Sequence, residues 1–376
     1  MENLYFIAQQ FTHPSPVQTV QPYGAGNVND TYLVTVASND DTRPQQRFVL
    51  QRINTNVFRQ PELILLNMRE FLTHMERHAA QAAEQSAARW EMPRILSAVT
   101  TGQDYYVDQE GAFWRAISLI EAAKTHAEIR NAAHAREAGS ALGRFHRLLS
   151  DLNPAQLHDT LPGFHVTPQY VAHYDQVLQR ETARVRSQGE GTEAVTQGIQ
   201  FVAERRGSAS VLEDALARGE LALRAIHGDP KVDNILIDEA SGRAVSIIDL
   251  DTVKPGLVHY DIGDCLRSCC NPAGEETTDL SSVTFDMDLC RIILEGYFEE
   301  AARFFTPADY HYLYDSIRLI TFELGLRFFT DYLAGDVYFK VKHSSHNLQR
   351  ALVQFRLTEC IEQSECEIKQ LIAAQT

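Results

Sequence analysis

The stretch HGDPKVDNILID (residues 227–238) contains a histidine, three acids, a lysine and an asparagine within twelve positions. Asp229 lies five residues before Asn234, with Lys231 between them. In this spacing a carboxylate can accept the proton of an attacking hydroxyl, and the amide oxygen can hold a Mg²⁺ that bridges phosphates. A lysine two residues beyond the acid can reach a transferring phosphoryl group as negative charge develops on it. We therefore predict Asp229 and Lys231 as catalytic residues and Asn234 as a metal ligand.

The residues that follow, ILIDEASGRAVSIID (235–249), are typical of a β-hairpin with a turn at EASGR. A hairpin folded about its midpoint, between Ser241 and Gly242, would place Asn234 opposite Asp249. An amide and a carboxylate at one end of a hairpin suit a Mg²⁺ site, so Asp249 is predicted as the main metal ligand. Asp251 is expected on the same face of the strand. The alternative is that these acids are solvated turn residues whose spacing arose by chance.

The first ~120 residues are predicted to form a small, strand-rich lobe. Three strand-like runs come first, then a helical run over residues 60–83 with apolar positions at Leu63, Leu66, Phe71 and Met75. Two or three more strand-like runs follow, the last of them AFWRAISLI (112–120). This order is typical of a lobe that clamps a nucleotide.

A glycine-containing turn, YGAGNVNDTY (23–32), separates the first two of these runs. A dinucleotide-binding fingerprint needs a helix directly after the glycines, and a Walker A loop needs Gly-Lys, which the chain lacks. A turn between two strands suits instead a flap whose backbone N–H groups cover ATP phosphates, although a plain hairpin turn is the alternative. Gly24, Gly26, Asn27 and Asn29 are therefore predicted to bind nucleotide.

The strand FVLQRI (48–53) lacks the lysine that usually contacts the α- and β-phosphates of ATP, because the first lysine of the chain is Lys124. Strand alternation points only one of Gln51 and Arg52 toward the nucleotide. Arg52 is favoured for its permanent charge and its fork of donors, and Gln51 is the alternative. Glu121, beside the predicted connector, completes the nucleotide-binding set.

The rest of the chain is predicted to be mainly helical, with a long helical tail over 283–375. We expect an α+β fold of two lobes, residues 1–121 and 122–376. The net charge of −16 argues against a general nucleic-acid or anionic-membrane binder. No apolar run is long enough to span a bilayer, no signal peptide is evident, and the six cysteines form no CxxC pair. We expect a reduced, cytoplasmic protein that is a monomer or homodimer.

The pattern H-G-D-x-x-x-x-N, then I-I-D, then Y-D-I-G-D resembles the aminoglycoside phosphotransferase/choline kinase superfamily. Within it, the chain is similar to the bacterial N-acetylhexosamine 1-kinases from about residue 17 to 345. The segments that carry this similarity are YGAGNVNDTYLVT, FVLQRINTNVFRQPE, IIDLDTVKPGLVHYDIGD and ELGLRFFTDYLAGDVYF (323–339).

The resemblance implies a bilobal protein-kinase-like fold and ATP- and Mg²⁺-dependent phosphorylation of a sugar hydroxyl, the anomeric hydroxyl of an N-acetylhexosamine. It implies that Asp30, Asp229, Arg327 and Tyr338 contact the sugar. Two alternatives stay open: a kinase for an aminoglycoside, choline or another amino alcohol, and an inactive kinase fold that only binds nucleotide. Asp261, in Y-D-I-G-D, is expected to cap a helix or to brace the backbone of the catalytic loop.

Overall fold

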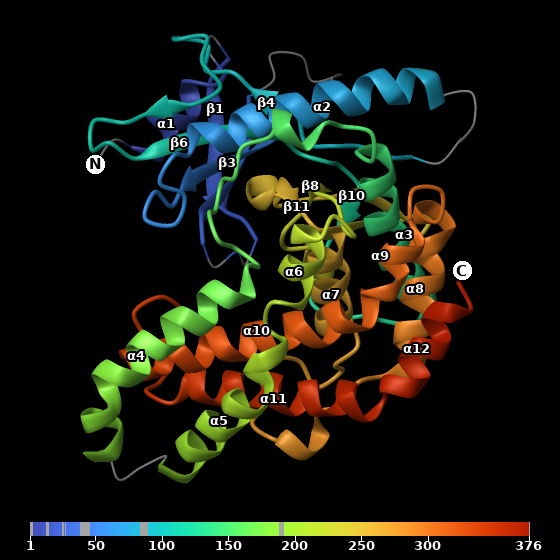
Figure 1. The fold of residues 1–376 in the computed structure, drawn as a ribbon. Coiled ribbons are helices and arrows are strands. Elements are labelled where there is room, and N and C mark those ends of the chain that lie inside the picture. The colour runs from blue at the N-terminus through green and yellow to red at the C-terminus, as the bar shows by residue number, and fades with distance from the viewer. Residues whose placement is uncertain are drawn as a thin grey trace. The chain divides into compact units, whose positions relative to one another are not determined.

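The chain divides into two compact units that differ in secondary structure, one built on a β-sheet and one mainly of helices (Figure 1). The first unit comprises Met1–Ala123 with two short later segments, Ala155–Pro162 and Ile248–Lys254. The second comprises the rest, Lys124–Pro154, Gly163–Ile247 and Pro255–Thr376. The α+β class with a sheet-containing N-terminal region and a helical C-terminal region is confirmed.

The computed structural model describes most of the chain, with backbone alone described at 78–82, 181–187 and 192. The described residues are 3–12, 15–24, 26, 28–37, 46–82, 89–187 and 192–375.

The sheet of the first unit is antiparallel and has the strand order β1-β2-β3-β6-β4, with β5 also paired to β6. Its strands are β1 (Val17–Pro22), β2 (Asp30–Val36), β3 (Arg47–Ile53), β4 (Ile95–Leu96), β5 (Tyr106–Val107) and β6 (Phe113–Ser118). The short helix α1 (Leu4–Gln9) packs Ile7 against a core that contains Val34, Leu50 and Trp114. This core packs α1 against the central strands β2, β3 and β6.

Helix α2 (Glu62–Ala82) buries a different face from the one predicted. Phe71 and Met75 are buried as expected, but Leu66 is 51% exposed and the buried positions before it are Ile64 and Leu65. The run LILLNM (63–68) is apolar at nearly every position, so its periodicity does not single out one face. The side chain of Asn67, on the same helix, donates hydrogen bonds to the main-chain oxygens of His158 and Val253.

The second unit is built around α10, which is buried on nearly all sides and packs against α4, α7 and α11 (Figure 1). Its helices are α3 (Ala132–Leu148), α4 (Thr167–Ser187), α5 (Thr192–Arg205), α6 (Val211–Ala217), α7 (Val258–Cys269), α8 (Met287–Ala301), α9 (Pro307–His311), α10 (Leu313–Ala334), α11 (His346–Gln363) and α12 (Glu365–Ala373). The interruptions predicted in the helical tail fall between α8 and α9 and between α10 and α11. No helix among the described residues is long and apolar enough to cross a membrane.

Helices α3 and α8 approach each other through glycines. A Cβ atom added to Gly139 would meet the main-chain oxygen of Ile293, and one added to Gly143 would meet that of Tyr297. The hydroxyl of Ser140 donates across the same contact to the main-chain oxygen of Gly296, at 3.2 Å. The two helices can lie this close together because Gly139 and Gly143 have no side chains.

Gly139→Ala should lower the free energy of unfolding by about 1–3 kcal/mol, because backbone atoms of α8 cannot yield to a new methyl group without moving the helix. Urea denaturation measures the change. Gly207→Ala is the matched control, since no atom lies within 4 Å of the added Cβ and the change should stay within about 0.5 kcal/mol. Equal stabilities of the two variants would contradict this account of the packing.

The hairpin of β9 (Ile235–Asp238) and β10 (Ala244–Ile247) forms as predicted, but its register differs from the predicted one, by two residues next to the turn and by one at the other end. Ile247 pairs with Ile235 and Ala244 pairs with Ile237, with a β-bulge in between. The carboxylate of Asp238 accepts hydrogen bonds from the backbone N–H and the hydroxyl of Ser241 in the turn. The predicted register, which paired Asn234 with Asp249, was therefore wrong. The pairing already differs next to the turn, whose geometry is not visible in a pattern of apolar residues, and the bulge makes up only part of the difference.

Candidate active site

The catalytic loop predicted from the sequence lies in the second unit, between β8 (Arg224–Ile226) and β9. It turns at Gly228, whose φ of +86° lies in the left-handed region that favours glycine. The next side chain, that of Asp229, is 32% exposed, while its neighbours in the loop are mostly buried. The Asp229 carboxylate is thus accessible from solvent.

The three predicted residues of this loop lie together. The side-chain nitrogen of Asn234 donates to the main-chain oxygen of Asp229 at 2.7 Å and to its carboxylate at 3.3 Å. The Nζ atom of Lys231 lies 3.5 Å from the same carboxylate and 3.9 Å from that of Asp233. Since the Asn234 amide nitrogen is turned toward Asp229, its amide oxygen is the atom that could ligate a cation.

Asp261, on α7, braces the backbone of the loop, the second of the two roles predicted for it. Its carboxylate accepts hydrogen bonds from the backbone N–H groups of His227 at 2.6 Å and Gly228 at 2.8 Å. It also lies 2.8 Å from Nε2 of His146, whose other ring nitrogen bonds Tyr297. Burial acts to raise the pKa of Asp261, but the His146 bond and the backbone donors outweigh it and lower that pKa.

Arg327, predicted to contact the acceptor, lies on α10 among aromatic rings. Its guanidinium carbon is 5.1 Å from the ring centroids of Phe164 and Tyr170 and 5.5 Å from that of Phe339. Within the described part of the chain, no acceptor forms a hydrogen bond or ion pair with this guanidinium. Burial raises the pKa of Tyr170 to about 12, so its phenol stays neutral beside the cation. The rings hold the charge in place while its N–H donors stay available to a ligand.

Tyr338 follows α10 in a loop that is tied to the end of that helix. The carboxylate of Asp331 accepts hydrogen bonds from the backbone N–H groups of Val337, Tyr338 and Phe339 at 2.8–3.0 Å. The Tyr338 side chain is 57% exposed. Its backbone position is therefore fixed while its ring is open to solvent.

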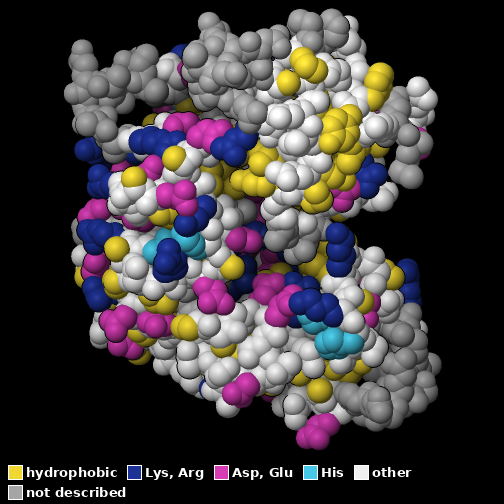
Figure 2. Space-filling view, turned by 180° about the vertical axis from the view of Figure 1, so that it is seen from behind, with side chains coloured by type: hydrophobic (Ala, Val, Ile, Leu, Met, Phe, Trp, Pro, Cys, Tyr) yellow, Lys and Arg dark blue, Asp and Glu magenta, His cyan; other side chains and the backbone are white. Residues whose placement is uncertain are grey.

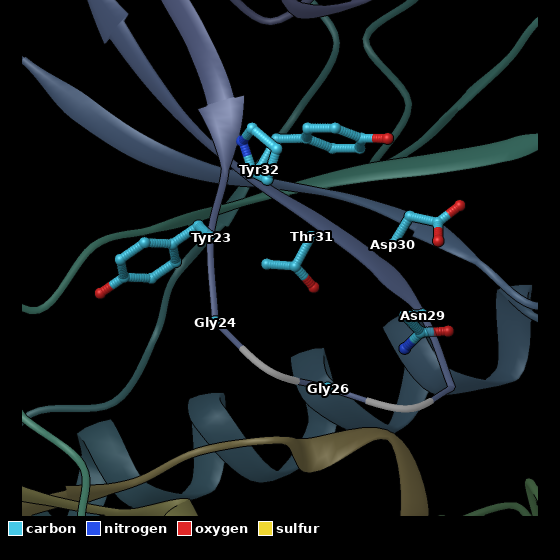
Figure 3. A pocket seen from close by; sticks show the side chains of 8 residues that line it. Tyr23, Gly24, Gly26, Asn29, Asp30, Thr31 and Tyr32 are labelled. Carbon is cyan, nitrogen blue, oxygen red and sulfur yellow. The ribbon is translucent and has the colours of Figure 1, made fainter. Parts of the chain in front are cut away.

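In the first unit, the predicted flap lines a pocket (Figure 3). Gly24 has a φ of +76°, and it lies with Gly26 on the loop that closes one side of the pocket. The other lining residues are Pro22, Tyr23, Asn29, Asp30, Thr31 and Tyr32. Asn27 lies outside the described residues.

Asn29 ties the base of the flap to a buried ion pair. Its side-chain nitrogen donates to Asp251 at 2.7 Å, and its side-chain oxygen accepts from the backbone N–H of Asn54 at 2.9 Å. Asp251 forms an ion pair with Arg115, of β6, and each side chain is only 2% exposed. Arg115 also donates to the side-chain oxygen of Gln51, at 2.7 and 2.9 Å. The side chains of Gln51 and Asp251 are thus both bonded to Arg115 inside the first unit.

Arg52 and Asp30, predicted to contact different ligands, are bonded to each other on the exposed side of β2 and β3. Their side chains are 51% and 43% exposed. Glu121 forms an exposed ion pair with Arg47. The roles of Arg52 and Glu121 toward a nucleotide stay predictions.

Asp249 follows β10, which ends at Ile247, and is not part of that strand. It is exposed and has a φ of +63°, uncommon for a residue other than glycine and frequent at functional sites. The chain then enters a 3₁₀ turn over Leu250–Thr252, so the prediction that Asp249 and Asp251 share one face of a strand was wrong. Asn234 belongs to the second unit and Asp249 to the first, and their joint binding of a metal stays a prediction.

Comparison with known proteins adds a family match. A protein-family model described as "Phosphotransferase enzyme family" matches residues 19–280, well over half of the 376 residues. The match includes the flap, the catalytic loop and Asp249.

Solved structures share the fold. An aminoglycoside phosphotransferase from Alicyclobacillus acidocaldarius superposes with a TM-score of 0.58 at 15% identity, over 95% of this chain and 93% of that one. A microcompartment-associated aminopropanol kinase gives 0.56 at 17% identity, over 97% and 98%. A spectinomycin phosphotransferase, solved in complex with ADP and spectinomycin, gives 0.51 at 10% identity, over 100% and 98%. At these identities the likeness shows the fold alone.

Proposed function

Because the chain belongs to the phosphotransferase enzyme family, we propose that it transfers the γ-phosphoryl group of ATP to the anomeric hydroxyl of an N-acetylated hexosamine. The observation that carries this proposal is the catalytic loop, in which Asp229 lies beside Lys231 and Asn234. The Asp229 carboxylate, with Nζ of Lys231 3.5 Å away, is the group proposed to accept the proton of an attacking hydroxyl. Lys231 then faces the charge that develops on the transferring group.

The residues proposed to hold Mg²⁺ are chemically suited to it. An amide oxygen from Asn234 and a carboxylate from Asp249 are the hard oxygen ligands that Mg²⁺ takes together with phosphate oxygens and water. Among the described residues no group of three or more His, Cys, Asp or Glu side chains is placed to hold a metal by itself. The proposed site consists of Asn234, Asp249 and the phosphates of the nucleotide. Bound there, Mg²⁺ would neutralise charge on the phosphates.

We assign nucleotide binding to the first unit. Gly24 and Gly26 line the pocket and have no side chains to keep phosphate oxygens away from their backbone N–H groups. Arg115 carries a buried permanent charge, but Asp251 already neutralises it. On β3, Arg52 is still the residue that we propose to contact a phosphate. It would then break its ion pair with Asp30 and bind the nucleotide instead. Whether ATP or GTP is preferred stays open.

The charge of Arg327 favours a neutral acceptor. A guanidinium held by three rings can donate hydrogen bonds to the hydroxyl or acetamido oxygens of a sugar. The same cation would repel the ammonium groups of an amino alcohol or aminoglycoside. Asp30 and Tyr338 are the further sugar contacts proposed.

A second candidate, a kinase for a cationic amino alcohol, is favoured by one observation. Asp264 is 6% exposed, and one of its carboxylate oxygens has no hydrogen-bond partner among the described residues. The other oxygen is held by Arg267 at 2.8 Å. That oxygen is buried, so an ammonium group could bind it only after the surrounding side chains moved aside.

A panel of acceptors in an ADP-release assay with Mg²⁺ tests both candidates. N-acetylhexosamines should stimulate ADP release over the basal rate, and choline, aminopropanol and aminoglycosides should not. The reverse pattern would replace the first candidate by the second. No stimulation by any acceptor would support the third reading, an inactive nucleotide-binding module.

We also propose that the protein acts without nucleic acid or membrane partners, in the cytoplasm, as a monomer or homodimer. On the face shown in Figure 2, acidic and basic side chains are interspersed over the helical unit instead of forming one basic patch. The net charge of −16 likewise opposes binding to polyanions.

A further inference from the structure

His165 connects the catalytic loop to α10. It precedes α4, is 3% exposed and has a φ of +65°. Its Nε2 atom lies 2.8 Å from the main-chain oxygen of Gly228, the residue before Asp229. Its Nδ1 atom lies 3.0 Å from a carboxylate oxygen of Glu323, a buried residue of α10. The second carboxylate oxygen of Glu323 accepts from the hydroxyl of Thr167 at 2.7 Å.

Both partners of the His165 ring are acceptors. A peptide oxygen carries no hydrogen, and the Glu323 carboxylate accepts its other hydrogen bond from Thr167. A neutral imidazole has one N–H and could satisfy only one of the two contacts. With Glu323 as a carboxylate, only the imidazolium, with two N–H groups, can donate to both, and Glu323 then provides its counter-charge.

The surrounding groups agree with a protonated ring. Burial acts to lower the pKa of His165, but the charge and hydrogen bond of Glu323, the charge of Asp264 and the Gly228 oxygen outweigh it and raise that pKa. Tyr260 stacks on the ring at 5.5 Å and donates its own O–H to Glu213. Phe164 covers the ring at 4.0 Å without adding charge.

The Gly228 residue is therefore held at both ends. Asp261 accepts from its N–H, and His165 donates to its oxygen. Glu323 lies four residues, one helical turn, before Arg327 on the same face of α10. A chain of hydrogen bonds thus runs from the peptide before the proposed base to the helix that carries the proposed acceptor contact.

We propose that His165, as an imidazolium, is a positioning residue that holds Asp229 in register with the acceptor-binding helix α10. This inference rests on the function proposed above. Loss of the ring proton removes the donor to either Gly228 or Glu323 and loosens the loop that presents the base. A histidine with a raised pKa keeps its proton below that pKa and loses it as the pH rises, so turnover should fall on the alkaline side.

His165→Asn tests this inference, because asparagine tolerates the left-handed backbone and can donate to only one of the two partners. We expect kcat to fall about 100-fold, as for a base misplaced by about an ångström, with little change in the KM for ATP. The alkaline decline assigned to His165 should also disappear from the pH profile. His259→Asn is the matched control: that ring is also fully buried in the second unit, makes one bond to the main-chain oxygen of Asp309 and has a pKa lowered by burial to about 4. Its kcat should stay within about 3-fold of the parent's.

Glu323→Gln gives a second readout. It keeps an oxygen that can accept from His165 but removes the counter-charge, so the alkaline decline should move to lower pH. A purely structural role of the pair predicts reduced stability with an unmoved profile. Unchanged kcat and pH profile in His165→Asn would overturn the inference while leaving the proposed function intact.

A direct measurement does not depend on activity. In protein labelled with ¹⁵N-histidine, two ring N–H signals should be present at neutral pH and absent from His165→Asn. A single ring N–H signal for His165 would overturn the inference whatever the acceptor proves to be. If the parent protein itself transfers phosphate to no acceptor, the proposed function fails, and these signals still decide the protonation of His165.

Discussion

Asp229→Asn should lower kcat by about 10²–10⁴-fold, the usual contribution of a general base. Asparagine keeps the shape of the side chain and an oxygen that can accept from Asn234, whose amide lies 3.3 Å from the carboxylate. It cannot take up the proton of the attacking hydroxyl. The affinity for ATP should change little, because the proposed nucleotide site lies in the first unit. Acceptor-dependent ADP release measures turnover, and calorimetric titration measures ATP binding.

Asp233→Asn is the matched control for this change. Asp233 is an exposed acid of the same loop and lies 3.9 Å from Nζ of Lys231, so its replacement also removes a negative charge beside that lysine. Its kcat should stay within about 3-fold of the parent's. Equal losses in both variants would mean that the charge near Lys231 matters and that Asp229 is not the base.

Asp261→Asn should lower the free energy of unfolding by about 3 kcal/mol and lower kcat as well. Asp261 is fully buried, and its carboxylate serves two backbone N–H groups and His146. The asparagine amide has only one oxygen to accept these hydrogen bonds. Its NH₂ group would face an N–H donor or have no partner, and either arrangement destabilises the folded state. The backbone of His227 and Gly228 would then lose one of its supports. Urea denaturation measures the stability of the variant, and the ADP-release assay measures its turnover.

The same substitution should change how stability depends on pH. The folded-state pKa of Asp261 is lowered, so its contribution is complete above the ordinary aspartate pKa and is lost as the pH falls through the lowered value. The asparagine variant should lack this part of the acid sensitivity. Asp288→Asn, whose side chain is 88% exposed, should match the parent to within about 0.5 kcal/mol at every pH. If the free energies of unfolding of the two variants are equal at every pH, Asp261 does not stabilise the loop.

Much of the fold could be predicted because its elements are marked locally. The strand runs, the glycine turn and the breaks in the helical tail are each visible in a few neighbouring residues. The buried face of α2 could not be predicted, since LILLNM offers apolar side chains in every direction. The hairpin register was wrong for a related reason: the pairing next to the turn and one bulged residue both set the register without changing the pattern of apolar residues.

The proximity of Asp229, Lys231 and Asn234 could be predicted because the three lie within six residues of one another. His165, Glu323 and Arg115 could not be found in this way. Glu323 is 158 residues from His165 in the sequence, and Arg115 sits in an otherwise apolar strand without a motif. The one local signal was Arg115 inside the apolar run AFWRAISLI. A charged side chain in such a run indicates that it is paired with another buried group, but it does not identify that group.

The identity of the phosphorylated atom tests the central claim most directly. The protein is incubated with ATP, Mg²⁺ and an N-acetylhexosamine, and the product is examined by ³¹P NMR with coupling to the sugar protons. The account predicts a phosphate on the anomeric carbon, formed by the parent protein and lost with Asp229→Asn. A phosphate on another carbon, or transfer only to a cationic amino alcohol, would contradict the proposed acceptor and the role given to Arg327.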